Sequence, residues 1–359
     1  MRFETSRVLD AIERRLSTDP MVARAVVDLA EAVRYQDLDG GRVASLLRLG
    51  QVVDALGRMA GEESVAVYTV VDRGLLSDNE LTSNERMVIR RWADDGLLEV
   101  LAPAGDRILE IADLTGLPVL TRRDPRPLSR GYPWLLDDPG RLLVPRAENG
   151  GAVLVGSGGI ASPSSFSHPV LARLWRCPQS GCELFGPDRI GGQPPPRLRA
   201  GVPSCPRHEH PLADGGPRPP AIAFAVRVGG VVRERFTLVA GSPVAVGREP
   251  AEPGGVRLGP WLGEDALRMV SRSHLTLTLT HTGVEVVDMS TNGTFVRGLS
   301  TPDTRLVRGD RRPLAERDVV ELYDGVELAR ADRWRSGGAA EPRSIMAEAP
   351  TVSLRLPRQ

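Results

Sequence analysis

A stretch rich in glycine, proline and serine divides this chain of 359 residues into parts with different sequence patterns. Such a stretch has too few apolar residues to build a packed core, and the length allows two or three domains. Helical and buried-strand patterns precede the stretch, whereas short alternating strands follow it. We therefore expect a multidomain protein with five regions: 1–61, 62–157, 158–220, 221–332 and 333–359.

Residues 1–61 are predicted to form a helical bundle. A helix begins the chain, and Asp19 and Pro20 form an N-cap and N1 pair that predicts a second helix over 21–35. An apolar stripe predicts a third helix over 41–59. No polar residues converge in this region, so we expect no site there.

Residues 62–157 are predicted to form a small α/β unit. A continuous β-branched run over 65–71 is typical of a strand buried on both faces. Further along, helices and strands alternate, which predicts a parallel sheet. The expected helices are 85–93 and 106–114, the expected strands are 97–101 and 117–121, and a hairpin is expected over 142–155.

From residue 221 onward, short strands with frequent glycine turns dominate. Leu275, Leu277 and Leu279 alternate with threonines and fall on one face of a strand. This pattern predicts an all-β sandwich over 221–332. Residues 333–359 are rich in Gly, Ala, Pro and Arg, which is typical of a disordered tail.

All 46 basic residues are arginine, so the sequence contains no lysine. This excludes P-loop hydrolases, protein kinases and Schiff-base enzymes, because each needs a lysine amine. The 46 acidic residues balance the arginines, so we expect no global attraction to nucleic acid or membranes. The chain has neither a signal-peptide pattern nor an apolar run near the ~20 residues that span a bilayer. With only three cysteines, an odd number, we expect a cytoplasmic protein without a disulfide framework.

Three segments of the predicted sandwich place polar residues at strand ends. Gly247 and Arg248 follow one strand, residues 271–274 (SRSH) precede another, and residues 288–296 (DMSTNGTFV) follow a third. A phosphate monoester needs several donors in fixed positions, and guanidinium, hydroxyl and amide groups supply them. These residue types at strand ends and in loops favour a phosphate-binding site.

In this order and spacing the segments resemble those of the forkhead-associated (FHA) domain, a β-sandwich whose loops bind phosphothreonine peptides. The resemblance covers residues 221–332. It implies that the phosphopeptide-binding residues are Arg248, Ser271, Arg272, Thr291 and Asn292, and that the supporting residues are Gly247, His274 and Gly293.

The resemblance also implies individual roles. Arg248 and Ser271 would bind the phosphate directly, with Arg272 assisting. Thr291 would contact the phosphothreonine, and Asn292 would hold the peptide backbone. The chain departs from the family pattern at Arg297, where the family often has Asn, and at residues 316–318 (ERD), where it has a Gly-Asp pair. Residues 261–269 occupy the loop that helps the family select the residue three positions after the phosphothreonine.

The Gly/Pro-rich stretch contains all three cysteines. Three thiolates and one imidazole form a complete tetrahedral set for structural Zn²⁺, and a region poor in apolar residues gains stability from such an ion. We predict a zinc-ribbon-like module over about 174–212, with His210 as an alternative to the histidine of the Cys-x-x-His pair. Its ligands would be Cys177, Cys182, Cys205 and His208. Four protein ligands leave no open position, so the expected role is structural.

Four acidic residues of the α/β unit fall at strand ends or helix starts: Asp72, Glu85, Asp106 and Asp124. Such positions gather at one edge of a parallel sheet, where carboxylates can bind Mg²⁺ or Mn²⁺ and activate water for phosphodiester cleavage. Residues 106–112 (DRILEIA) and 117–121 (LPVLT) resemble PIN-like nucleases, although Arg73 stands where that family usually has a small hydroxyl residue. The same acids also fit helix N-caps and solvated loop charges.

The sequence favours a phosphothreonine-binding adaptor in a bacterial Ser/Thr-kinase pathway, with a Thr-phosphorylated protein as its partner. The alternative is a metal-dependent ribonuclease that its FHA domain targets. A smaller hypothesis concerns Thr351, which follows a proline in the tail. If phosphorylated, it would occupy the FHA site of the same or another copy; the alternative is an unmodified threonine.

Overall fold

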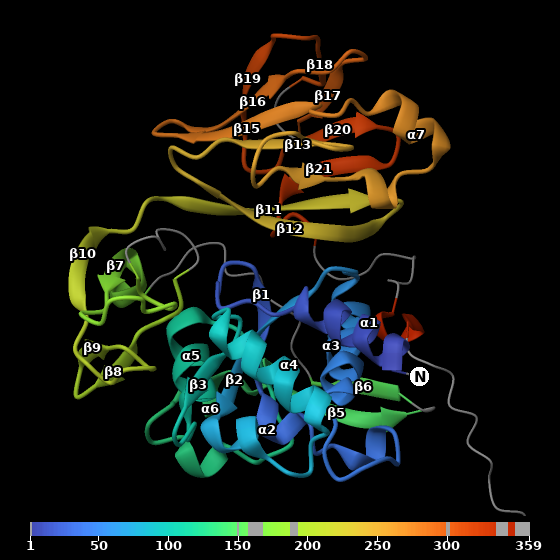
Figure 1. The fold of residues 1–359 in the computed structure, drawn as a ribbon. Helices are drawn as coiled ribbons and strands as arrows, with labels where there is room; N and C mark the ends of the chain where they lie inside the picture. Colours follow the sequence, from blue (N-terminus) through green and yellow to red (C-terminus); the bar gives the residue numbers. More distant parts are fainter. Residues whose placement is uncertain are drawn as a thin grey trace, which may run out of the picture.

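The computed structural model describes residues 2–148, 151–156, 168–186, 193–298, 302–334 and 344–348. An α/β unit, a small module of paired short strands and a β-sandwich follow one another along the chain (Figure 1). Thr351 lies outside the described residues. Within the described ranges, we find no helix with the length and apolar character that a bilayer crossing requires.

The α/β unit is built on a six-stranded sheet with the order β3-β2-β1-β4-β5-β6. Strands β1 to β5 run parallel, and β6 pairs antiparallel with β5. The predicted strands and the predicted hairpin are therefore present. The bounds are β1 (Ala23–Asp28), β2 (Ala66–Asp72), β3 (Glu99–Leu101), β4 (Val119–Leu120), β5 (Leu142–Glu148) and β6 (Gly151–Val155).

Two hydrophobic cores lie on the two faces of this sheet. Val27 and Val67 enter one core, whereas Val26 and Tyr68 enter the other, so both strands are buried on both faces. Helices α1 (Arg2–Glu13), α3 (Leu47–Ala60) and α4 (Ser83–Asp94) contribute to the first core, with the short α2 (Leu29–Ala32). Helices α5 (Arg107–Thr115) and α6 (Trp134–Asp137) contribute to the second.

The predicted helical bundle over 1–61 is wrong. The helix expected over 21–35 is instead strand β1 followed by α2. All six residues of β1 are buried, and a short strand that is buried on both faces lacks the alternation that separates strands from helices. The boundary predicted at residue 61 therefore falls inside one sheet, between β1 and β2.

The cysteine-containing module pairs β7 (Arg173–Arg176) with β10 (Ala213–Pro217), and β8 (Arg197–Arg199) with β9 (Val202–Ser204). The buried Arg107 of α5 joins this module to the α/β unit. Its guanidinium donates to the carbonyl oxygens of Pro195 at 2.6 Å and Pro196 at 3.2 Å, and pairs with Glu99 at 2.6 Å. The module is thus held against α5 by a fully buried cation.

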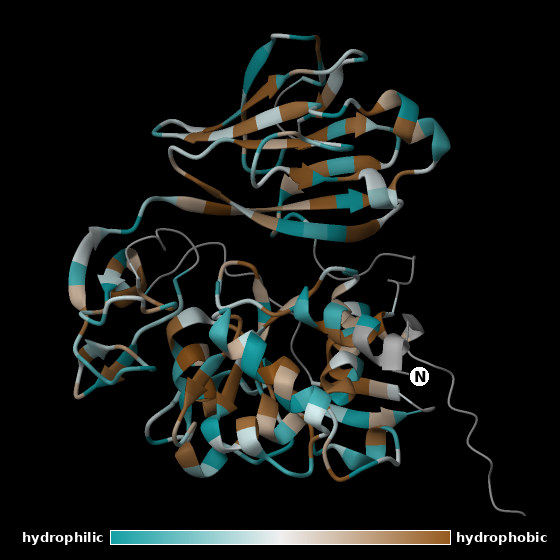
Figure 2. Cartoon of the chain, in the orientation of Figure 1, coloured by the Kyte–Doolittle hydropathy of each residue, from teal (hydrophilic) through white to brown (hydrophobic). Residues whose placement is uncertain are grey.

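The sandwich consists of sheets with the orders β12-β11-β21-β20-β17-β18 and β14-β13-β15-β16-β19. Hydrophobic residues recur along its strands (Figure 2) and meet in one core. The bounds are β11 (Ala221–Val228), β12 (Val231–Val239), β13 (Val244–Gly247), β14 (Val256–Arg257), α7 (Glu264–Met269), β15 (Leu275–Thr280), β16 (Gly283–Asp288), β17 (Thr294–Arg297), β18 (Thr304–Leu306), β19 (Arg311–Leu314), β20 (Val319–Tyr323) and β21 (Val326–Arg330).

Strand β12 attaches the sandwich to the α/β unit (Figure 1). The Glu63 N–H donates to the Val232 carbonyl oxygen at 2.7 Å. The carboxylate of Glu62 accepts from Arg235 at 2.7 and 2.8 Å and pairs with Arg24 of β1 at 3.1 Å. All three charged side chains of this cluster are buried, so the contact excludes water.

A second contact returns the end of the described chain to the α/β unit. The short 3-10 helix η7 (Ile345–Glu348) lies against α1 and α3, and Ile345 is buried in their core. The carboxylate of Asp54 on α3 accepts from the N–H groups of Ile345 at 2.7 Å and Met346 at 3.1 Å. The α/β unit therefore contacts both strand β12 of the sandwich and the segment that follows the sandwich in the chain.

Candidate functional site

Loops at one end of the sandwich surround an open cavity of about 830 Å³. Most of its lining comes from the segment after β13, the segment between α7 and β15, and the loop after β16. The three sequence motifs thus meet at one place. The lining includes all five residues predicted to bind the phosphopeptide: Arg248, Ser271, Arg272, Thr291 and Asn292.

The first two loops are held together by their backbones. The Arg248 N–H donates to the Ser271 carbonyl oxygen at 3.0 Å, and the Glu249 N–H donates to the Arg272 carbonyl oxygen at 3.2 Å. A Cβ atom on Gly247 would lie 1.9 Å from the Arg272 carbonyl oxygen, so only glycine permits this approach. The Arg248 guanidinium donates to the Leu267 carbonyl oxygen at 2.6 Å, which fixes its position at the cavity.

His274 joins the second loop to the third from beneath the cavity. Its ring is fully buried; Nδ1 accepts from the Ser271 N–H at 3.1 Å, and Nε2 donates to the Gly293 carbonyl oxygen at 3.3 Å. This pair of bonds needs a neutral imidazole with its proton on Nε2. Burial lowers the pKa of His274 and favours that neutral form. The geometry is that of a positioning residue and not of a base.

Asp288 organises the third loop, and sequence reasoning did not single it out as a site residue. Its buried carboxylate accepts from the Ser290 N–H at 2.9 Å and from the hydroxyls of Ser290 and Thr294. The Ser290 hydroxyl oxygen in turn accepts from the Gly293 N–H at 2.7 Å. The Asp-x-Ser turn that precedes Asn-Gly is the sequence signal that indicates this role.

Thr291 and Asn292 are the residues of this loop that were predicted to bind the phosphopeptide, and both line the cavity. The Thr291 N–H donates to the Ser271 hydroxyl oxygen at 3.2 Å. The Asn292 amide nitrogen donates to the Met269 carbonyl oxygen at 2.9 Å, so Asn292 also anchors the end of α7. Arg268 and Arg308 line the same cavity from α7 and from the turn between β18 and β19. No spacing rule in the sequence predicts that these two arginines reach the site.

Residues 246–322 match the family model described as the FHA domain. This part of the chain is an FHA domain. Among solved structures, the MEK1 FHA domain is 25% identical, with 31% of this chain and 87% of that chain covered and a TM-score of 0.23. The FHA-1 domain of Mycobacterium tuberculosis Rv1747 is 24% identical, with 30% and 94% covered and a TM-score of 0.21. A comparison with curated proteins gives no match. The cavity described above belongs to the FHA domain.

The cysteine-containing module holds a second candidate site. Cys177 Sγ lies 3.4 Å and Cys205 Sγ lies 3.6 Å from His208 Nδ1, and the sulfur atoms of Cys182 and Cys205 are 3.8 Å apart. A tetrahedral zinc ion with Zn–S bonds of about 2.3 Å and Zn–N bonds of about 2.0 Å separates its ligands by about 3.5 to 3.8 Å. The set therefore fits Zn²⁺. His210 lies outside the cluster and contributes only its carbonyl oxygen, which accepts from the Cys205 N–H at 2.8 Å.

The carboxylates proposed for a nuclease site have other partners. Glu85 forms the capping box of α4 with Thr82 and pairs with Arg42 at 2.9 Å. Asp72 accepts from the N–H groups of Gly74 at 2.8 Å and Ala104 at 3.3 Å. Helix capping and loop closure therefore account for these two acids.

The other two acids of that set are also engaged. Asp106 accepts from the Tyr132 hydroxyl at 2.6 Å, and the exposed Asp124 pairs with Arg126 at 2.7 Å. Within the described part of the chain, the Cys3His set is the only group of three or more His, Cys, Asp or Glu residues close enough to share an ion. Asp72, Glu85, Asp106 and Asp124 do not form such a group.

Asp28 is a carboxylate that sequence reasoning missed because β1 was predicted as a helix. It ends β1, which lies between β2 and β4, where the strand order reverses and open α/β sheets bind ligands. Asp28 accepts from the Glu31 N–H at 3.2 Å and lies 3.5 Å from Arg123. Burial raises the pKa of Asp28.

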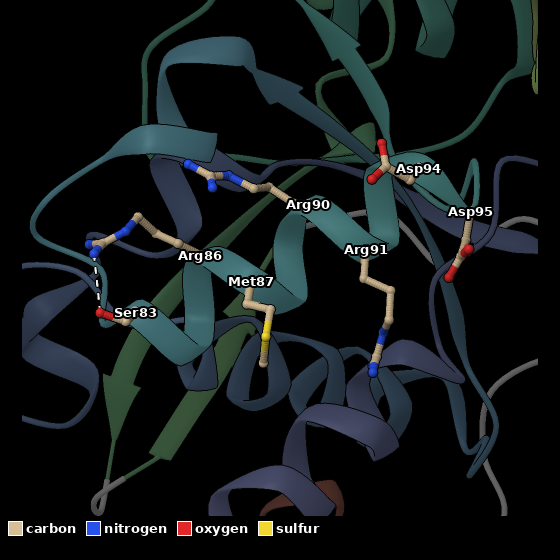
Figure 3. Close-up of a pocket in the computed structure, with 7 residues that line it drawn as sticks. All are labelled: Ser83, Arg86, Met87, Arg90, Arg91, Asp94 and Asp95. Carbon is tan, nitrogen blue, oxygen red and sulfur yellow. Dashed lines mark hydrogen bonds between the residues drawn. The ribbon is translucent and has the colours of Figure 1, made fainter.

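A separate hollow of about 620 Å³ lies on the exposed side of α4 (Figure 3). Its arginines serve local structure: Arg86 donates to the Asp78 carbonyl oxygen at 3.1 Å, and Arg90 donates to the Leu76 carbonyl oxygen at 2.9 Å. We assign no ligand to this hollow. Its lining residues are Ser83, Arg86, Met87, Arg90, Arg91, Asp94 and Asp95.

Proposed function

We propose that this protein is a phosphothreonine-dependent adaptor whose FHA domain binds a Thr-phosphorylated partner protein. The observation that carries the proposal is the convergence of three FHA motifs on one open cavity. Guanidinium, hydroxyl and backbone N–H groups are the ligands that a phosphate dianion needs. The fold supplies guanidinium and hydroxyl groups from loops that hydrogen bonds hold in place.

The contacts of each residue support a division of roles. Ser271 accepts from the Thr291 N–H through its hydroxyl oxygen, which leaves the hydroxyl proton to donate to a phosphate oxygen. Arg248 is fixed by Leu267 and brings a charged donor to the same cavity. Arg272 adds a second charge, while Gly247, His274 and Gly293 keep the loops at their spacing.

We further propose that a Ser/Thr kinase of a bacterial pathway phosphorylates the partner and that the protein works in the cytoplasm. The free, closely spaced thiols of Cys177, Cys182 and Cys205 support a reducing compartment. With His208, these thiols would hold a structural zinc ion that stabilises the module beside α5. Four protein ligands leave that ion no open position for catalysis.

The adaptor function predicts that Arg248→Ala weakens phosphopeptide binding by about 30-fold, since loss of a charge-assisted phosphate contact costs about 2 kcal/mol. Fluorescence anisotropy of the full chain with a phosphothreonine peptide, selected from a peptide library, measures the change. Arg330→Ala, which removes an arginine of β21 outside the cavity, is the matched control. Equal binding by wild type and Arg248→Ala would contradict the proposal.

A metal-dependent ribonuclease is the second candidate function. The observation that favours it is that β1 and β2, neighbouring parallel strands, both end in an aspartate, Asp28 and Asp72, and that β1 borders the switch in strand order. The engaged positions of Glu85 and Asp124 do not support their proposed catalytic roles.

This candidate predicts Mn²⁺-dependent cleavage of single-stranded RNA by the full chain, with at least a 100-fold loss in the variant Asp28→Asn plus Asp72→Asn. Arg248→Ala, altered only in the FHA cavity, should cleave at the wild-type rate. Absence of metal-dependent cleavage, or cleavage by the double variant at the wild-type rate, would remove this candidate and leave the adaptor function untouched.

A further inference from the structure

The cavity of the FHA domain carries more positive charge than one phosphate monoester neutralises. Its lining contains one acidic residue, Glu249, which already pairs with Arg257 at 3.0 Å. A phosphothreonine brings a charge of about −1.5 to −2. About two positive charges therefore remain once the phosphate is bound. The four arginines that line the cavity are Arg248, Arg268, Arg272 and Arg308.

Five arginines elsewhere on the sandwich pair with acids of the sandwich. Among the described residues, the four cavity arginines form no ion pair. Two acids close in sequence to the cavity arginines are used elsewhere: Glu252 accepts from the Ser273 hydroxyl at 2.8 Å, and Asp310 accepts from the Val307 N–H at 3.0 Å. These five pairs are Arg227–Glu327, Arg257–Glu249, Arg297–Glu321, Arg311–Glu285 and Arg330–Glu316.

Arg268 and Arg308 hold the positions beside the phosphate-binding motifs. Arg268 lies in the last turn of α7, next to Met269, whose carbonyl oxygen accepts from Asn292. Arg308 lies in the turn whose Gly309 N–H donates to the Asp288 carbonyl oxygen at 2.8 Å. Both guanidinium groups are exposed at the cavity, so a ligand can reach them without any rearrangement.

We propose that the FHA domain selects a peptide with two anionic groups, the phosphothreonine and a second anion that Arg268 and Arg308 receive. This inference rests on the proposed phosphothreonine function. The second group is a carboxylate or another phosphate, because a guanidinium binds either in bidentate geometry. The charges of the cavity thus define the partner as an acidic or multiply phosphorylated segment.

The test measures binding of the full chain to phosphothreonine peptides by fluorescence anisotropy. The parent peptide has neutral flanking residues, and two series place one Glu or one phosphoserine at each flanking position in turn. We expect at least one position in one series to improve affinity about three- to tenfold, with the gain falling as salt rises. A gain from Glu identifies a carboxylate partner, and a gain from phosphoserine alone identifies a second phosphate.

Two paired variants assign that gain to the named arginines. Arg268→Gln plus Arg308→Gln should abolish the gain, measured as the ratio of the affinities of the anionic and parent peptides for the same variant, whereas Arg268→Lys plus Arg308→Lys should keep most of it. A gain that persists in the Gln variant overturns the inference. If the parent peptide binds but no added anion helps, the inference fails and the adaptor function stands. If no phosphothreonine peptide binds, both fail.

Discussion

At the scale of single residues, Gly247 sets the distance between two loops of the FHA cavity. We expect Gly247→Ala to destabilise the protein by about 1–3 kcal/mol and to weaken phosphopeptide binding, because its Cβ would overlap the Arg272 carbonyl oxygen. Chemical denaturation and peptide titration measure the two effects. Gly263→Ala is the control, since a Cβ at Gly263 meets no atom within 4 Å. Wild-type behaviour of Gly247→Ala would contradict this account of the loops.

Residues that belong to a local motif were the predictable ones. Arg248, Ser271 and Asn292 could be selected because each sits in a recognisable segment, and the structure brings those segments to one cavity. Arg268 and Arg308 reach the same cavity from elements that carry no motif, so only the three-dimensional structure reveals them. Asp28 was missed for a different reason: its strand is buried on both faces and shows no strand periodicity.

At the scale of elements, the short strands of the cysteine-containing module have only a small core of their own. We therefore expect zinc to stabilise them, with His208→Ala losing the ion and His210→Ala keeping it, because only His208 lies in the cluster. Metal analysis by mass spectrometry should find about one zinc ion per wild-type chain. Limited proteolysis after chelation should cut first within this module. Zinc in the His208→Ala variant at the wild-type level would argue against the ligand set.

Elements with strong local patterns were predicted well, and the hairpin of β5 and β6 is an example. The order of strands could not be predicted, because β1, which lies between β2 and β4, was predicted to be a helix. The four candidate nuclease carboxylates were selected only from their positions at strand ends and helix starts. Strand ends do not reveal the partners of these acids, some of which are close in sequence, such as Thr82 for Glu85, and others distant, such as Arg42 for Glu85.

At the scale of the whole molecule, the α/β unit and the sandwich share a contact that contains Glu234 of β12. Burial raises the pKa of Glu234 from 4.5 to about 7, although Arg15 of the α/β unit offsets part of the effect. A raised pKa means that the folded state binds more protons than the unfolded state between these values. The contribution of Glu234 to stability is therefore fully present below pH 4.5 and is lost as pH rises through 7.

We predict that Glu234→Gln, which mimics the protonated acid, gains up to about 3 kcal/mol of stability relative to wild type between pH 5 and pH 8. Urea denaturation at both pH values measures this difference, and the comparison cancels the titration of other groups. Glu249→Gln is the control, because Glu249 is exposed on the sandwich. A difference between Glu234→Gln and wild type that does not change with pH would refute the assignment.

The return of Ile345 to the first core has a consequence for how the protein is made. The last strand of the α/β sheet ends at Val155, and the module and the whole sandwich lie between it and Ile345. Because a ribosome releases the chain from its N-terminus, the α/β unit emerges early but lacks a core residue until the FHA domain has been synthesised. The first core of the α/β unit is therefore complete only after the FHA domain has been synthesised.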